Sequence, residues 1–226
     1  MTARTIALVG ADGAGKSTIT RMLEREPLPF PVKRVYMGVN LESSSLMLPT
    51  TRALLAVKRA RGRRPDLAAA AAGGPAGVRH GWRRSGKDAL RATVWMLEEW
   101  LRQLVAVGYT RRGYVVVFDR HFYADYFHTD VAATAGRGPW ARVHGWMLQH
   151  AYPKPDLVIC LDAPGDVLYT RKPEASAAWL EQRRRQYLSL AAVLPRFAVV
   201  DADRSLATVF ADVVDAISSQ RKDPTT

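Results

Sequence analysis

The chain has 226 residues, 48% of them hydrophobic, which suits one large domain with a full core. Its formal net charge of +12 comes from 26 arginines and 7 lysines against 21 acidic residues, a balance that favours anionic partners such as nucleotides or nucleic acid. The single cysteine, Cys160, excludes an intrachain disulfide, and no apolar stretch approaches the ~18 residues of a membrane span. We therefore expect a cytoplasmic protein with no membrane partner, in which Cys160 is a core residue.

The first predicted strand covers residues 5–9 (TIALV), and the stretch GADGAGKST follows at residues 10–18. We call residues 10–18 the phosphate loop because they fit the pattern G-x-x-x-x-G-K-[ST]. Residues 16–26 then show helical spacing of apolar side chains. The motif thus lies between a strand and a helix, as phosphate binding requires; the alternative is a glycine turn that merely joins them.

The chemistry of this loop predicts a bound triphosphate and Mg²⁺. Gly13 and Gly15 allow the backbone to curl so that N–H groups point inward, and the following helix adds its positive end. Lys16 brings a full charge to the outer phosphates, and the Ser17 hydroxyl is a candidate Mg²⁺ ligand. The residues expected to bind the phosphates are Gly13, Ala14, Gly15, Lys16, Ser17 and Thr18.

Further predicted strands alternate with predicted helices along the chain. The strands are expected at residues 33–37, 114–118, 156–161 and 197–201, and the helices at 88–107, 121–130, 138–150, 165–171, 175–193 and 205–218. This alternation predicts an α/β fold of the P-loop NTPase kind, with a mostly parallel five-stranded sheet and helices on both faces. We expect residues 1–226 to form one domain.

Residues 39–87 break this rhythm. They include a basic run at 58–64 and a low-complexity stretch, DLAAAAAGGPAGVRHG, at 66–81. Long loops without secondary structure are uncommon in compact domains unless they bind something or stay disordered. We predict a basic, partly flexible insertion here, and the alternative for the basic run is a solvated surface.

The third predicted strand ends in VVVFDR, which puts Asp119 and Arg120 at its carboxyl tip. Ligands of open α/β sheets bind outside the carboxyl ends of strands. We expect Asp119 to hold Mg²⁺ through water and Arg120 to present its guanidinium to a phosphate. His121 follows and is a candidate for substrate contact. The alternative for the first two is an ordinary surface ion pair.

Two further features follow the fourth predicted strand. Asp162 ends that strand and is expected to cap the helix from Gly165. The segment 171–185 carries Arg171 and later three consecutive arginines, 183–185, and we interpret it as a mobile lid that neutralises charge on transferring phosphates. Consecutive helical residues point in different directions, so the three arginines cannot all reach one ligand; a solvated basic helix face is the alternative.

Several segments together resemble the thymidylate kinase family of P-loop nucleoside monophosphate kinases. They are GADGAGKST (10–18), FDRH (118–121), PDLVICLDAPGDVLYTRK (155–172), EQRRRQYLSLA (181–191) and VVDAD (199–203). Their order and spacing cover most of the chain outside residues 39–87. The resemblance implies an ATP-dependent kinase with Mg²⁺ that can pair as a homodimer.

The resemblance also implies roles for particular residues. The Asp12 carboxylate would point away from the ATP phosphates, toward the sugar hydroxyl of the acceptor nucleotide, while Arg120 would grip the acceptor phosphate. Asp201 and Ala202 would lie near adenine, and Arg171 would belong to the lid. The expected catalytic set is Lys16, Asp119, Arg120 and Arg171.

The acceptor half departs from the family pattern. Glu98 and Glu99 stand where a base-reading arginine is expected, and HFYADYFHTD (121–130) follows Asp119-Arg120 in place of Ser and Tyr-Gln. We predict dTMP as the phosphoryl acceptor, and the alternative acceptor is a hydroxyl group of a nucleoside or sugar. A nucleic-acid-stimulated P-loop ATPase, suggested by the net charge and the basic stretches 58–64 and 79–87, is disfavoured because aromatic residues for base stacking are sparse in the 58–64 run. A signalling GTPase is disfavoured because no N-K-x-D or T-K-x-D sequence follows.

Overall fold

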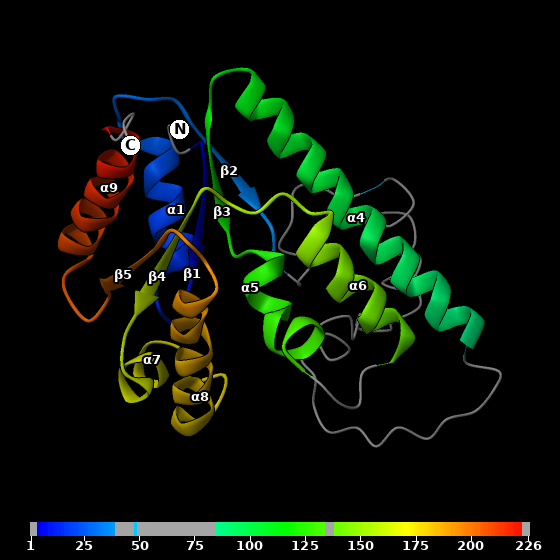
Figure 1. Ribbon diagram of the computed structural model, residues 1–226. Coiled ribbons are helices and arrows are strands. Elements are labelled where there is room, and N and C mark those ends of the chain that lie inside the picture. The colour runs from blue at the N-terminus through cyan, green and yellow to red at the C-terminus, as the bar shows by residue number, and fades with distance from the viewer. Residues whose placement is uncertain (1–3, 39–47, 49–84, 134–137, 223–226) are drawn as a thin grey trace, which may run out of the picture.

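A five-stranded parallel sheet forms the centre of the protein in this computed structural model, which describes residues 4–38, 48, 85–133 and 138–222 (Figure 1). The strands are β1 (Thr5–Val9), β2 (Val32–Tyr36), β3 (Val115–Asp119), β4 (Leu157–Asp162) and β5 (Phe197–Asp201). Their order is β2-β3-β1-β4-β5, and every neighbouring pair is parallel. The predicted α/β class and parallel sheet are confirmed.

The connections between the strands are helical wherever the structure describes them at length. The helices are α1 (Lys16–Arg25), α4 (Ser85–Arg111), α5 (Phe122–Tyr126), α6 (Pro139–His150), α7 (Gly165–Arg171), α8 (Ala177–Leu188) and α9 (Leu206–Lys222), with a π-helix, η3 (Phe127–Val131), after α5 and a 3-10 helix, η4 (Ser189–Ala192), after α8.

Two hydrophobic clusters cover the two faces of the sheet, because successive strand residues point to opposite faces. Ile6 and Leu8 of β1 pack with Ile19 of α1 and Val213 of α9 on one face. The intervening residues of β1 face the second cluster, to which α4, α5, α6 and α8 contribute. The structure therefore has helices on both faces, as predicted.

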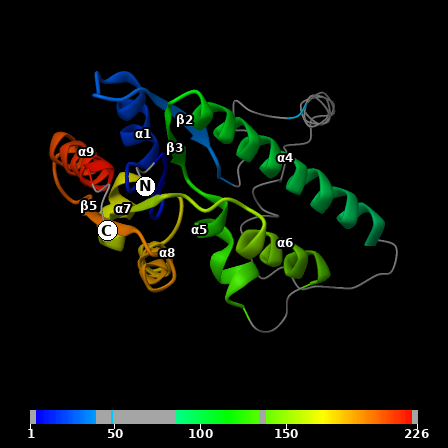
Figure 2. The same cartoon turned by 45° about the horizontal axis from the view of Figure 1, so that its top comes forward.

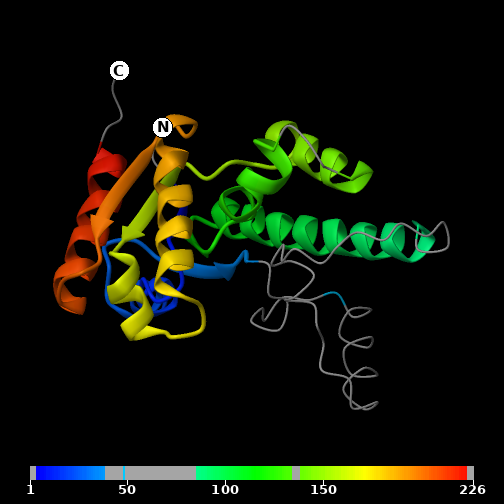
Figure 3. The ribbon, with the colours of Figure 1, turned by 90° about the horizontal axis from the view of Figure 1, so that it is seen from below.

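Helices on the same face of the sheet pack against one another. Helices α1 and α9 lie side by side, while α6 runs beside α4 at the other side of the molecule (Figures 1 and 2). Figure 3 shows α4 extending well beyond the sheet. The strand register brings Tyr36, Leu8 and Asp119 level with one another, and Asp162 level with Asp201. The carboxyl ends of the strands thus share one edge of the sheet.

The sequence-based boundaries differ from the observed ones by a few residues. The expected helix 121–130 is divided into α5 and the π-helix η3, and the expected helix 175–193 is divided into α8 and η4. The predicted insertion at 39–87 lies mostly outside the described residues, and its last three residues begin α4. Among the described residues, no helix has the length and apolar character that crossing a membrane requires.

Candidate functional site

The phosphate loop joins β1 to α1 at the carboxyl edge of the sheet, and its glycines have the positive φ values that this turn needs. Gly13 and Gly15 have φ of 91° and 88°. A Cβ at Gly13 would lie 2.7 Å from the Leu168 carbonyl oxygen of α7, whereas a Cβ at Gly15 would meet nothing within 4 Å. The loop is therefore packed against α7 on one side and open at Gly15, where the helix begins.

Lys16 closes the loop from within. Its Nζ donates hydrogen bonds of 2.7 Å to the carbonyl oxygens of Gly10 and Ala11, and the residue is only 5% exposed. Burial lowers the pKa of Lys16 to about 8, with Arg120 acting in the same direction and nearby carboxylates opposing it. The ammonium group is thus held at the centre of the loop by two carbonyl oxygens. Only a strong anion, such as a phosphate, would compete with these carbonyl oxygens for its N–H groups.

The loop offers backbone donors that have no acceptor within the described part of the chain. These are the N–H groups of Gly13, Gly15, Lys16 and Ser17; by contrast, Thr18 and Ile19 both donate to the Gly15 carbonyl oxygen in the first turn of α1. Unpaired N–H groups at a helix N-terminus, beside a buried ammonium, favour a phosphate anion.

Ser17 and Asp119 meet across the gap between α1 and β3. The Ser17 hydroxyl donates a 3.2 Å hydrogen bond to Asp119, whose other carboxylate oxygen lies 3.4 Å from Arg34. Two oxygens this close fit a Mg²⁺ ion that takes its remaining ligands from phosphate and water. No group of three or more His, Cys, Asp or Glu side chains in the described ranges has metal-binding geometry.

Asp12 lies between two cations. It pairs with Arg120, and its carboxylate is 3.9 Å from Lys16. Burial alone would raise the pKa of Asp12, but Arg120 and Lys16 hold it below the ordinary value. Arg120 has a φ of 69°, rare for a residue with a side chain, and a Cβ at Gly38 would lie 2.5 Å from its Cδ. The backbone strain is thus found at the residue that reaches Asp12.

Asp125 is a half-buried acid that the sequence analysis did not single out. It accepts a 2.8 Å hydrogen bond from the Tyr187 hydroxyl of α8. Burial raises the pKa of Asp125, while the positive charges of Arg120, Arg183 and Lys16 partly offset this. An acid within the aromatic segment FYADYF was the available signal; its partner, 62 residues away, was not visible in the sequence.

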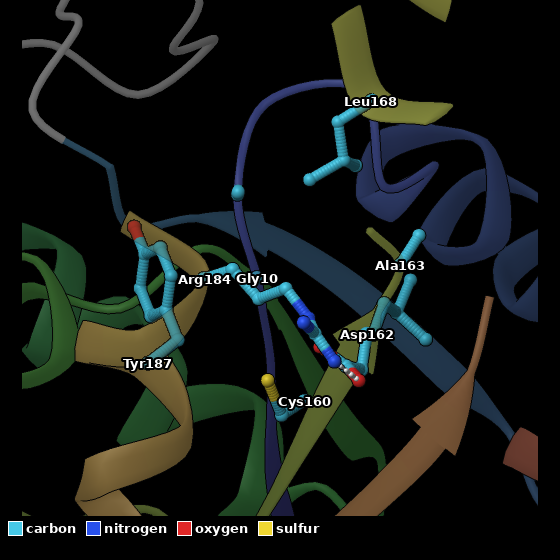
Figure 4. A pocket seen from close by; sticks show the side chains of 9 residues that line it. Gly10, Cys160, Asp162, Ala163, Leu168, Arg184 and Tyr187 are labelled. Carbon is cyan, nitrogen blue, oxygen red and sulfur yellow. Dashed lines mark hydrogen bonds and ion pairs between the residues drawn. The ribbon is translucent and has the colours of Figure 1, made fainter. Parts of the chain in front are cut away.

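The expected lid arginines occupy different environments. Arg184 binds Asp162 with two hydrogen bonds, of 2.6 and 2.9 Å, and lines a small hollow beside Gly10 and Ala11 (Figure 4). Arg185 is 77% exposed, and Arg183 lies over the Tyr187 ring. The prediction that these arginines diverge is confirmed, and Arg184 is the one beside the phosphate loop.

The prediction that Asp162 caps α7 is wrong. Pro164 occupies the N-cap position, no side chain caps the helix, and the Gly165 N–H donates to Glu181 of α8 instead. The Asp162 carboxylate instead pairs with Arg184, whose two charge-assisted hydrogen bonds occupy both of its oxygens.

A second group of expected site residues lies at the ends of β4 and β5. Arg171 donates a 2.8 Å hydrogen bond to the Ala202 carbonyl oxygen, and the Ala202 N–H donates to the Asp162 carbonyl oxygen. Asp201 is exposed and accepts the Asp203 N–H. The structure thus connects Arg171 to the 201–203 turn and, through Asp162, to the hollow beside the loop.

His121 is buried rather than open to the surface. Its Nδ1 accepts the Tyr123 N–H and so caps α5, its Nε2 has no partner within the described residues, and burial lowers its pKa to about 4. The imidazole is therefore neutral, and substrate contact by His121 stays a prediction. Cys160 is buried as expected, and burial raises the pKa of its thiol to about 12.

A scan against protein-family models finds no match to this chain, and a search of curated proteins finds none either.

Proposed function

We propose that this chain has the P-loop NTPase fold and is an ATP-dependent phosphotransferase that passes the γ-phosphoryl group to a small molecule. The observation that supports this best is the phosphate loop, in which Lys16 and unpaired backbone N–H groups lie at the start of α1, beside the Ser17–Asp119 pair. The thymidylate kinase resemblance makes dTMP the first acceptor to test.

The residues act mainly by position and charge. The N–H groups of the loop and Lys16 would bind the outer phosphates, and Ser17 and Asp119 would hold Mg²⁺, which supplies further positive charge. Arg184 and Arg171 would then contact ATP, whereas Asp12 and Arg120 would contact the acceptor. Phosphoryl transfer needs little covalent chemistry from a protein, so such an arrangement suffices for catalysis.

The test is ATP turnover by a Lys16→Ala variant with a panel of acceptors. We expect turnover to fall by about 100-fold or more, because phosphate charge is then stabilised without the ammonium group. Arg112→Ala is the control, since Arg112 is exposed in the turn before β3, at the opposite edge of the sheet. Both variants should keep the thermal unfolding midpoint of the wild type within a few degrees. Unchanged turnover in folded Lys16→Ala would refute the assignment of the phosphate loop.

A further inference from the structure

The acceptor side of the site contains two buried carboxylate oxygens that no donor contacts. They are Oε2 of Glu98 on α4 and Oδ2 of Asp125 on α5, and neither has a hydrogen-bond partner within the described part of the chain. Burying a carboxylate oxygen without a donor is costly. Proteins tolerate such an oxygen where a ligand supplies the missing hydrogen bond.

Glu98 is held so that only this second oxygen is free. The residue is 1% exposed, and its Oε1 accepts a 2.9 Å hydrogen bond from the Leu48 N–H. One turn later on α4, Arg102 is equally buried and donates to the Gly38 carbonyl oxygen, while its Nε and Nη2 lack partners among the described residues. Gly38 in turn packs against Arg120. These contacts thus connect Asp12 and Arg120, through Gly38, to the buried face of α4 that carries Arg102.

Asp125 flanks Arg120 from the other direction. The Tyr187 hydroxyl fixes Oδ1 at 2.8 Å and leaves Oδ2 free. The charged groups that act on this carboxylate are Arg120 after β3, Lys16 of α1 and Arg183 of α8. Asp125 therefore lies in the electrostatic field of both the ATP-binding ammonium and the acceptor arginine.

Arg120 itself is already neutralised. Its guanidinium pairs with Asp12, and Asp125 is a second negative charge in its vicinity. An acceptor phosphate would have to displace Asp12 and then lie near two carboxylates, those of Asp12 and Asp125. Like charges in a buried setting repel strongly, so this arrangement disfavours an anionic acceptor.

We propose that the acceptor is an unphosphorylated, neutral or cationic molecule rich in hydroxyl or amino groups. The carboxylates of Glu98 and Asp125 accept hydrogen bonds from these groups. This inference rests on the proposed phosphotransfer and replaces dTMP by an alcohol as the acceptor. Arg102 would bind an oxygen next to the group that donates to Glu98. Both carboxylate oxygens are covered, so the acceptor opens this part of the site as it enters.

The chemical step then needs a proton acceptor. The acceptor's hydroxyl oxygen forms a bond to the γ-phosphorus, the bond from that phosphorus to the oxygen bridging the β-phosphate breaks, and ADP leaves. The hydroxyl proton passes to Asp125 Oδ2 and afterwards to water. A buried carboxylate beside Lys16 and Arg120 suits this task, because burial raises the pKa of Asp125 and makes the carboxylate more basic.

The experiment compares matched acceptor pairs in an ATP-consumption assay with product mass as the readout. The pairs are thymidine and dTMP, uridine and UMP, D-glucose and glucose 6-phosphate, and D-glucosamine and glucosamine 6-phosphate. We expect the unphosphorylated member of at least one pair to have a kcat/KM at least about tenfold higher than its partner, since one buried charge clash costs this much or more. Preference for dTMP or another phosphorylated member, or no turnover of any unphosphorylated compound, would overturn the inference.

Isosteric variants distinguish the roles of the two carboxylates. Asp125→Asn should lower kcat by roughly 100-fold with little change in KM, as expected for loss of a general base. Glu98→Gln should raise the acceptor KM by about tenfold at unchanged ATP KM, as expected for a lost charged hydrogen bond. Tyr187→Phe, which frees Asp125 Oδ1, should give a smaller loss of kcat and serves if Asp125→Asn does not fold. Variants that match the exposed control Asp215→Asn in both constants would overturn the roles assigned here.

Calorimetric titration with a non-hydrolysable ATP analogue and Mg²⁺ distinguishes the two levels of failure. A wild-type protein that does not bind the analogue refutes the phosphotransferase itself. A protein that binds it but prefers phosphorylated acceptors refutes only the identity of the acceptor.

Discussion

At the scale of single residues, Asp12 shows how a carboxylate is tolerated in a loop that we propose binds phosphate. It pairs with Arg120 and lies 3.9 Å from Lys16, so its charge is matched before any ligand arrives. The loop residues Lys16 and Ser17 were predictable because their spacing is fixed by the motif. Asp125 and Arg102 were not, because their polar partners come from segments far away in the chain.

We predict that Asp12→Ala raises the acceptor KM by roughly tenfold or lowers kcat, because a hydrogen bond to a charged group is lost and Arg120 is released. ATP affinity should stay close to that of the wild type, since the loop donors and the Lys16 hydrogen bonds to Gly10 and Ala11 do not involve Asp12. Steady-state kinetics with each substrate varied in turn measures this. Loss of ATP affinity with no effect on the acceptor would contradict the acceptor role.

At the scale of elements, α8 shows what sequence periodicity can and cannot supply. Its existence and the divergence of its three arginines followed from helical spacing alone. The choice of Arg184 as the residue beside the loop did not, because it depends on how α8 packs against the end of β4. Likewise the π-helix η3 was predicted as ordinary helix, since one inserted residue per turn leaves little trace in the pattern.

We expect Arg184→Ala and Arg185→Ala to behave differently, although the two residues are adjacent. Arg184→Ala removes a bidentate ion pair at the hollow beside Gly10 and should lower kcat/KM for ATP by about tenfold or more. Arg185→Ala removes an exposed side chain and should change it by less than about twofold. Equal effects of the two variants on ATP turnover would argue against a lid arginine at position 184.

At the scale of the whole molecule, a buried polar network ties α4 to α6 and η3. His144 of α6 lies between Glu99 of α4, at 2.9 Å, and Asp130 of η3, at 2.6 Å, and the Tyr152 hydroxyl also donates to Glu99. The sequence marked Glu99 only as a departure from a family pattern. Its structural role depends on three segments meeting, which no local pattern reveals.

This network predicts a dependence of stability on pH. Burial alone would lower the pKa of His144, but Asp130 and Glu99 raise it to about 9, whereas an unfolded histidine has a pKa of about 6.5. The folded state thus binds this proton more tightly. The stabilisation is fully present below about pH 6.5 and is lost as pH rises through about 9.

Urea unfolding between pH 6 and pH 9.5 should therefore show that His144→Gln costs more stability at pH 6 than at pH 9.5. The difference is of the order of 3 kcal/mol if the full shift is realised. His150→Gln is the matched control, because His150 is exposed at the end of the same helix. Parallel pH profiles for the wild type and His144→Gln would rule out the charged network.

The division of the core between the two sheet faces has a consequence for how such a protein can change. Helices α1 and α9 pack on one side of the strands, whereas α4, α5 and α6 pack on the other. Substitutions of the residues that pack around Glu98 and Asp125 therefore disturb only one of the two packing layers. The packing of β1 against α1, which positions the phosphate loop, is left unchanged. If the chain is the proposed ATP-dependent kinase, its acceptor specificity would therefore change by substitution in one packing layer while its ATP site stays intact, in the laboratory as in evolution.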